Sequence, residues 1–243
     1  NLTPRQWLTV RTKSFKKWFG DWENDKKNAS KVLDSNGEPL VVYHGTSVKF
    51  DRFEPKRSGN VGHDFGELIF FTDDHRVASG YSINMKKNKE IMDAIDNRDK
   101  LWNAVSKAVI DYGVNSSEFK LAHKKWKEAD DIRSKHYDAI INYELITDGS
   151  NVIAGFLNIV KPYIVNGNGL NWRKVHTDAF EHYKKHVEYD GVIVINVNDS
   201  ATTNSSHEST IYAFPKANQV KSAIGNKGTF DKDSDNLHEN FIM

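Results

Sequence analysis

The chain has 243 residues, of which 38% are hydrophobic and 12% aromatic, so it can bury a substantial core and is not disordered throughout. The net charge is +1, and cysteine is absent, which excludes disulfides, thiolate nucleophiles and cysteine-based zinc sites. No stretch has the length and hydropathy of a membrane span or a signal peptide, so we expect a soluble, cytoplasmic protein with no membrane partner.

Residues 1–35 predict a helical N-terminal extension. Thr3 followed by Pro4 is typical of a helix start, and the aromatic residues of "SFKKWFG" share one helical face before the glycine ends the helix. We interpret the tryptophans of this segment as packing residues; they are Trp7, Trp18 and Trp22.

The next segment predicts two strands and then a helical hairpin. A turn in "DSNGEPL" precedes the strand "LVVYH", and the turn-rich residues 51–67 precede the strand "LIFFT". Over residues 85–142 the apolar period is helical, with a break at "GVNSSE". Between Ile83 and Ser150, twelve basic and twelve acidic residues balance, which gives no support for phosphate binding. We expect the hairpin to shape acceptor choice or contact a partner; the alternative is a packing appendage.

Strand-like runs return after the hairpin. They are "VIAGFLNIV", "YIV", "DGVIVINV" and "STIYAF", with a short helix around "HTDAFEHYKKH". The polar end, residues 225–243, is expected to be loosely ordered. These elements predict a mainly β domain that follows a helical extension and is interrupted by a helical hairpin.

Three stretches place polar or aromatic residues beside strands: "YHGT", "FGELIFFTDDHRVASGY" and "HESTIYAF". Familiar catalytic motifs are absent, since the chain contains no Walker loop, HExxH, GxGxxG or GxSxG. His182 and His186 are spaced for one helical face, but no glutamate follows the first, so we interpret them as surface residues and expect no metal site.

The three stretches together resemble the diphtheria-toxin-like ADP-ribosyltransferases of the His-Tyr-Glu type. Similarity is strongest to the transferase domains of polyvalent proteins in phages and bacterial mobile elements. Those domains also resemble this chain in "VRTKSFKKWFGDW", "FLNIVKPYIV", "YDGVIVINV" and "QVKSAIGNKGTFD". The resemblance covers nearly the whole chain except the hairpin. It implies an α+β fold with a split β-sheet core, and a single domain over residues 1–243 that includes the extension (1–35) and the hairpin (85–142).

The resemblance implies NAD as co-substrate and a catalytic set of His44, Tyr81 and Glu208. Cleavage of the bond between nicotinamide and ribose develops positive charge on the sugar, and a carboxylate close to the ribose stabilises that charge. Glu208 is the candidate for this carboxylate. Tyr81 matches the aromatic residue that closes one face of the nicotinamide ring.

The resemblance also implies further contacts to NAD. His44 would bond a ribose hydroxyl of the adenosine half, Gly45 would bind the carboxamide through its peptide groups, and Thr46 would add a hydroxyl contact. Phe70 stands where the family often has tyrosine, so it can stack but cannot donate a hydrogen bond. Ala78 stands where the polymerases have a serine that bonds the carboxamide, so recognition rests more heavily on Gly45.

The expected activity is mono-ADP-ribosylation of a macromolecule, because no sequence is recognisable for the second ADP-ribose pocket that polymer growth requires. The acceptor stays open between protein, DNA and RNA, with a slight tilt toward nucleic acid from the basic excess in residues 1–31. The family implies a toxin, defence or phage effector role, with a possible antitoxin or other neutralising partner. Two alternatives are an NAD glycohydrolase and an inactive NAD or ADP-ribose binding module.

Overall fold

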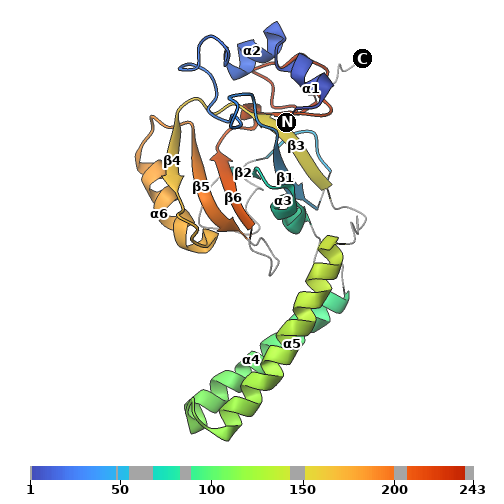
Figure 1. Ribbon diagram of the computed structural model, residues 1–243, viewed down its shortest axis with the longest axis vertical. Helices are drawn as coiled ribbons and strands as arrows, with labels where there is room; N and C mark the ends of the chain where they lie inside the picture. Colours follow the sequence, from blue (N-terminus) through green and yellow to red (C-terminus); the bar gives the residue numbers. More distant parts are fainter. Residues whose placement is uncertain are drawn as a thin grey trace.

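The computed structural model of the protein describes residues 2–47, 49–54, 68–82, 89–142, 151–199 and 207–238. These residues form a seven-stranded sheet and six α-helices (Figure 1). The sheet order is β4-β5-β6-β2-β1-β3-β7. The strands are β1 (Val42–Thr46), β2 (Ile69–Thr72), β3 (Asn151–Leu157), β4 (Pro162–Asn166), β5 (Gly191–Asp199), β6 (His207–Phe214) and β7 (Val220–Ser222). The helices are α1 (Pro4–Thr9), α2 (Lys13–Phe19), α3 (His75–Ser82), α4 (Lys89–Tyr112), α5 (Ser117–Asn142) and α6 (Trp172–Lys185), with a 3-10 turn at Ala217–Gln219.

The sheet is split between β1 and β2. These two strands are in register at one residue pair, Tyr43 with Thr72, whereas β1 pairs with β3 from Val42 to Thr46. β2 pairs with β6 along its whole length. Two halves result, β4-β5-β6-β2 and β1-β3-β7, and only a short contact joins them. β4 and β5 pair parallel, and the other neighbours pair antiparallel. The α+β fold with a split sheet is therefore confirmed.

Alternating side chains give the sheet a separate core on each face. On β6, Tyr212 and Phe214 belong to a core shared with β1, β2 and β7. Ile211 and Ala213 point to the other face, where α6 covers them with Val175, Ala179 and Phe180. The four-residue strand β2 contributes to both cores, which fixes its position next to the split.

The N-terminal extension packs on the sheet through a third, mainly aromatic core. Phe15 and Phe19 of α2 are fully buried, and Phe15 contacts Phe156 of β3 and Phe230 near the C-terminus edge-on. Trp18 also lies in this core and is only 3% exposed. The predicted packing role of the aromatic face is confirmed for this helix.

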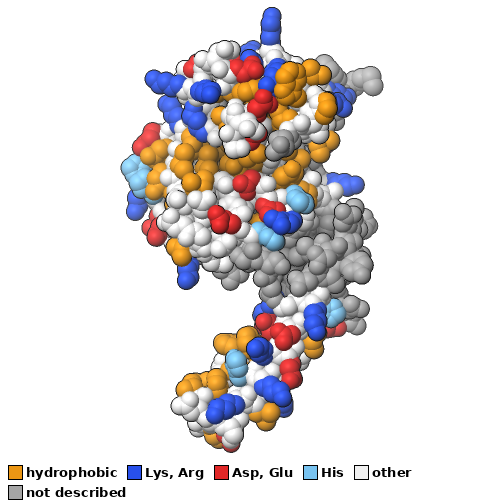
Figure 2. Space-filling view, in the orientation of Figure 1, with side chains coloured by type: hydrophobic (Ala, Val, Ile, Leu, Met, Phe, Trp, Pro, Cys, Tyr) orange, Lys and Arg blue, Asp and Glu red, His pale blue; other side chains and the backbone are white. Residues whose placement is uncertain are grey.

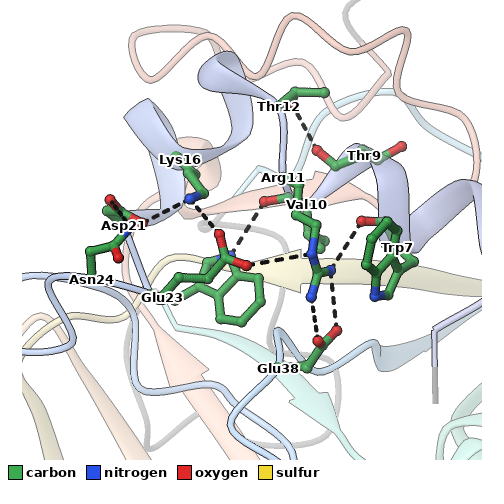
Figure 3. A network of polar contacts seen from close by, with 11 residues as sticks. Trp7, Thr9, Val10, Arg11, Thr12, Lys16, Asp21, Glu23, Asn24 and Glu38 are labelled. Carbon is green, nitrogen blue, oxygen red and sulfur yellow. Dashed lines mark hydrogen bonds and ion pairs between the residues drawn. The ribbon is translucent and has the colours of Figure 1, made fainter.

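Arg11 joins the start of the extension to the loop before β1 (Figure 3). Its guanidinium lies 3.9 Å from the centre of the Trp7 ring and 5.0 Å from that of Trp22, and it pairs with Glu38 and Glu23. Trp22 is buried as predicted, but Trp7 is 46% exposed. Trp7 therefore packs against a cation and not within the core, an arrangement that apolar periodicity does not reveal.

The segment after β7 is ordered as far as the structure describes it, to residue 238. Phe230 and Leu237 are buried, and the buried Lys221 donates from Nζ to the carbonyls of Ser234 and Asn236. The expectation of a loosely ordered end is therefore wrong for residues 225–238; residues 239–243 lie outside the described part. Two apolar residues and one buried cation hold a segment whose composition is otherwise polar.

The predicted hairpin is formed by α4 and α5, which project away from the sheet as an arm (Figure 1). Val105 and Ala108 of α4 and Ala129 of α5 are buried in the seam between the helices. Aromatic rings of both helices also meet, with the Trp102 and Trp126 centroids 5.1 Å apart. We call α4 and α5 together the arm.

Candidate active site

His44 lies on β1 where that strand separates from β2. Its Nδ1 is 2.7 Å from the carbonyl oxygen of Phe70 on β2, so the two strands remain joined through a side chain. Because a carbonyl can only accept, Nδ1 carries the hydrogen and Nε2 is left as an acceptor. Aromatic rings of Phe53 and Phe71 lie 4.9 and 5.4 Å from the imidazole. Burial among them lowers the pKa of His44, which keeps the ring neutral.

Gly45 is required by the packing of α3 on β1. A Cβ atom at this position would lie 1.7 Å from the carbonyl oxygen of Ala78 and 2.8 Å from the amide nitrogen of Ser82. Ala78 itself is 1% exposed, so no larger side chain fits between helix and strand. The sequence argument attributed this glycine to close approach of a ligand; the structure adds a packing reason that is sufficient by itself.

Tyr81, near the end of α3, reaches across to the end of β5. Its hydroxyl lies 3.1 Å from both carboxylate oxygens of Asp199. Asp199 is 4% exposed and is paired with His207 across β5 and β6. The start of α3 is anchored separately, since Asp74 accepts from the Arg76 amide. Both ends of this helix are therefore fixed by carboxylates.

Asp199 is a residue of the candidate site that sequence reasoning missed. It was inconspicuous because it ends a strand whose residues are otherwise mainly apolar. The usable signal was a single carboxylate at the end of the apolar run "GVIVINVND", directly before the loop that leads to Glu208. A charged side chain in such a position requires a partner when it is buried, and here Tyr81 supplies one.

Glu208 lies near Tyr81 and Asp199, as the second residue of strand β6. It is opposite Asn198 of β5 and next to His207 in the chain, and its side chain is exposed. Within the described residues its carboxylate makes no hydrogen bond or ion pair. The structure thus brings Tyr81 and Glu208 to the same end of the sheet, because Tyr81 bonds to Asp199 and Glu208 pairs with the preceding residue, Asn198.

The remaining predicted contacts divide between the two faces of the sheet. Phe70 is on the face covered by α6, where its ring meets Phe180 edge-on at 5.7 Å and Trp172 at 6.4 Å. The neighbouring Phe71 is buried in the opposite core. Thr46 is the last residue of β1, opposite Asn151 of β3. His44 and Thr46 share one face of β1, and Gly45 points to the other.

A second carboxylate is half-buried beside this site. Asp73 follows β2 and accepts from the Thr210 amide at 2.8 Å, which ties the start of α3 to β6 two residues from Glu208. Burial raises the pKa of Asp73. Burial, together with the nearby Asp73, also raises the pKa of Tyr212, which follows Thr210 on the same face of β6. Asp73 therefore fixes strand β6 close to the predicted catalytic glutamate.

The described residues contain neither a candidate metal site nor a candidate membrane span. No group of three or more His, Asp or Glu side chains in these residues is arranged to hold a metal ion. No helix in the same residues is long and apolar enough to cross a membrane.

The α+β fold is consistent with that of the ADP-ribosyltransferases, a class of enzyme that uses NAD as substrate. Residues 34–156, half of the chain, match the family described as ADP-ribosyltransferase in polyvalent proteins, and the chain belongs to that family. The match includes His44, Gly45, Phe70 and Tyr81 and ends before Glu208. Searches of curated proteins and of solved structures found no match.

Proposed function

We propose that the chain is an NAD-dependent mono-ADP-ribosyltransferase that modifies a macromolecule, with His44, Tyr81 and Glu208 as catalytic residues. The observation that carries the proposal is the pair of hydrogen bonds from Tyr81 to Asp199. These bonds hold the aromatic residue of α3 at the strand end from which Glu208 emerges. A ring that stacks on nicotinamide and a carboxylate near the ribose are needed at the same place, because both act on the bond that breaks.

The chemistry assigned to these residues is glycosyl transfer. The bond between ribose C1′ and the nicotinamide nitrogen breaks, and its electron pair leaves with nicotinamide. Glu208 accepts a hydrogen bond from the ribose 2′-hydroxyl and stabilises the positive charge that develops on the sugar. A nucleophile of the acceptor then attacks C1′ and loses its proton.

The rest of NAD is assigned to β1 and β2. Nε2 of the neutral His44 accepts from a ribose hydroxyl of the adenosine half, and Thr46 adds a second contact. The peptide groups of Gly45 bind the carboxamide, and Phe70 contributes an aromatic wall. Support for the role of His44 comes from its geometry: the bond to Phe70 fixes the tautomer that leaves Nε2 free to accept.

The biological setting that we propose rests on the family alone. It is that of a toxin, defence or phage effector enzyme in a bacterial cytoplasm, acting on protein, DNA or RNA, with a neutralising partner where it is a toxin. The absence of cysteine is compatible with a reducing compartment.

The test is labelling of a bacterial lysate with NAD radiolabelled in its adenylate half, followed by nuclease or protease treatment. We expect labelled macromolecules, with loss of label after one of the two treatments identifying the acceptor. Glu208→Gln keeps the size of the side chain and removes its charge, so turnover should fall at least about a thousandfold. NAD binding by Glu208→Gln should change by less than about threefold, because the lost interaction belongs to the transition state.

Other results would change the assignment. Release of nicotinamide without labelled macromolecule would indicate water as acceptor and an NAD glycohydrolase. NAD binding without any turnover would indicate a binding module. Full activity in Glu208→Gln would remove the proposed catalytic carboxylate.

A further inference from the structure

Helix α5 carries two lines of residues at heptad spacing, and only one of them is covered. The covered line faces α4 and includes Ala122, Trp126, Ala129 and Arg133, all buried or half-buried. The second line steps by three and four residues along the outside of the helix. It consists of Glu118, Leu121, Lys125, Glu128, Ile132 and Lys135, and every one of these side chains is exposed. We call this second line the outer stripe.

The outer stripe has the composition of an interface. Leu121 is 57% exposed and Ile132 51%, although both are large and apolar. Within the described residues, none of the four charged members forms an ion pair, even though Lys125 and Glu128 are neighbours on the helix. Figure 2 shows hydrophobic side chains lying among charged ones on the surface of the arm. A packing appendage would not need a second heptad line.

The order of residues along the outer stripe makes it complementary to itself in reverse. From its N-terminal end the outer stripe runs acid, apolar, base, acid, apolar, base, and from its C-terminal end it runs base, apolar, acid, base, apolar, acid. We propose that the outer stripe binds the same stripe of a second copy of this chain, with the two α5 helices antiparallel. Leu121 then faces the partner's Ile132, Lys125 faces the partner's Glu128, and Glu118 faces the partner's Lys135. All three pairs share one register, with the two-fold axis between Trp126 and Lys127.

Symmetry doubles each of these contacts. One antiparallel pair of helices contains two Lys125–Glu128 ion pairs at its centre, two Leu121–Ile132 contacts outside them and two Glu118–Lys135 ion pairs at its ends. This is the isologous arrangement expected of a homodimer. By ordinary helix dimensions the arm is about 36 Å long and about 20 Å wide, so two arms bury on the order of 1,000 Å². That area is small for a specific dimer, so we expect reversible association with a dissociation constant on the order of micromolar.

The arm also has the position that such a dimer requires. It projects from the sheet, so a second arm can lie along it while the two sheets stay at opposite ends (Figure 1). The candidate active site lies on the sheet, and the outer stripe is confined to α5. The proposal of a dimer therefore does not rest on the function proposed above.

The test is sedimentation equilibrium of the full chain between about 1 and 200 μM, a range in which weak homodimers dissociate. The double variant Lys125→Glu/Lys135→Glu makes the outer stripe acidic, and Glu118→Lys/Glu128→Lys makes it basic. Each alone places like charges opposite each other and should weaken the dimer at least about tenfold. An equal mixture of the two restores every opposite-charge pair, so it should form a heterodimer at least as tight as the wild-type homodimer.

Two controls separate the outer stripe from general effects of charge and folding. Lys120→Glu/Lys127→Glu makes the same change in net charge on the other side of α5 and should leave the dissociation constant within about threefold. Leu121→Ser removes an apolar contact without a change in charge and should weaken the dimer about tenfold. Circular dichroism checks that each variant keeps its helices.

Several results would overturn the proposal. A wild-type chain that stays monomeric over the whole range has no such dimer. Equal weakening by the acidic-stripe variant and by its control would show that net charge, and not the outer stripe, is responsible. Failure of the mixed variants to associate, when each retains its helices, would exclude the antiparallel register.

Discussion

At the scale of residues, the contact between Tyr81 and Asp199 leads to a testable expectation. We expect Asp199 to act through the Tyr81 hydroxyl by fixing the ring, so Tyr81→Phe and Asp199→Asn should each lower kcat/KM for NAD by roughly tenfold. The double variant should be no worse than the poorer single variant, because both remove one interaction. Nicotinamide release measures the effect.

Asp190→Asn serves as the matched control. This carboxylate lies at the start of β5 and accepts from the amides of Val160 and Lys161, away from the candidate site. Its loss should lower stability and leave kcat/KM within about threefold. Independent, additive losses for Tyr81→Phe and Asp199→Asn would mean that Asp199 has a role of its own.

Sequence reasoning selected candidate site residues by motif order but could not supply their environment. It selected His44, Tyr81 and Glu208, and the structure places the latter two at one end of the sheet. The neutral state of His44 depends on Phe53 and Phe71, which approach it from other segments. Asp199 becomes significant only when α3 crosses to β5. Long-range contacts of this kind leave no local pattern.

At the scale of elements, the packing of α3 on β1 makes Gly45 sensitive to the smallest substitution. Gly45→Ala would place a methyl group 1.7 Å from the Ala78 carbonyl, so the helix must move. We expect a loss of at least about 2 kcal/mol in the free energy of unfolding, measured by urea denaturation. The displaced helix should also carry Tyr81 away from Asp199 and lower NAD turnover.

Gly155→Ala on the neighbouring strand β3 is the graded comparison. Its added methyl would meet the Val220 side chain at 3.1 Å and the Lys221 carbonyl at 3.3 Å, contacts that need only a small shift. The destabilisation should be clearly smaller than for Gly45→Ala. Equal losses would mean that strand propensity, and not the approach of α3, determines the cost at Gly45.

Elements with strong periodicity were predicted well, and those held by isolated contacts were not. The hairpin and the aromatic helix of the extension have helical periods and are present as predicted. The segment 225–238 looked loose because its composition is polar, yet Phe230, Leu237 and the bonds of Lys221 hold it. Trp7 was predicted as a packing residue, and it packs at the surface against Arg11 and not within a core. Neither composition nor apolar periodicity predicts isolated buried contacts or the packing of an aromatic ring on a cation.

At the scale of the whole molecule, strand order could not be read from the sequence by periodicity. β6 inserts between β5 and β2, and β7 returns to the far edge beside β3, so neighbours in the sheet are distant in the chain. The split sheet was expected from the family resemblance, whose motifs fall on the strands beside the split. Short strands of four or five residues, such as β2 and β1, carry too little pattern to specify their partners.

The arm is nearly a separate unit, which gives a last expectation for the molecule as a whole. The three cores of the body contain no residue of α4 or α5 among the residues described, and the buried apolar residues of the arm lie in its own seam. Replacing residues 89–142 by a short Gly/Ser linker should therefore keep the body folded, with Tm within about 5 °C of wild type. Nicotinamide release should persist, whereas transfer to macromolecules should fall severalfold.

The acidic-stripe variant, Lys125→Glu/Lys135→Glu, retains the arm and disfavours the dimer. It therefore distinguishes an effect of the arm itself on transfer from an effect of the dimer. If deletion lowers transfer and the acidic-stripe variant does not, the arm itself contacts the acceptor. If the deletion and the acidic-stripe variant lower transfer equally, the dimer is the form that engages the acceptor. In that dimer the arm of each copy lies along the arm of the other. If transfer is unchanged after deletion, the arm has no role in acceptor choice. Dimerisation would then be the remaining role proposed for the arm. Labelled product per mole of released nicotinamide is the quantity to compare, because it corrects for any change in NAD turnover itself.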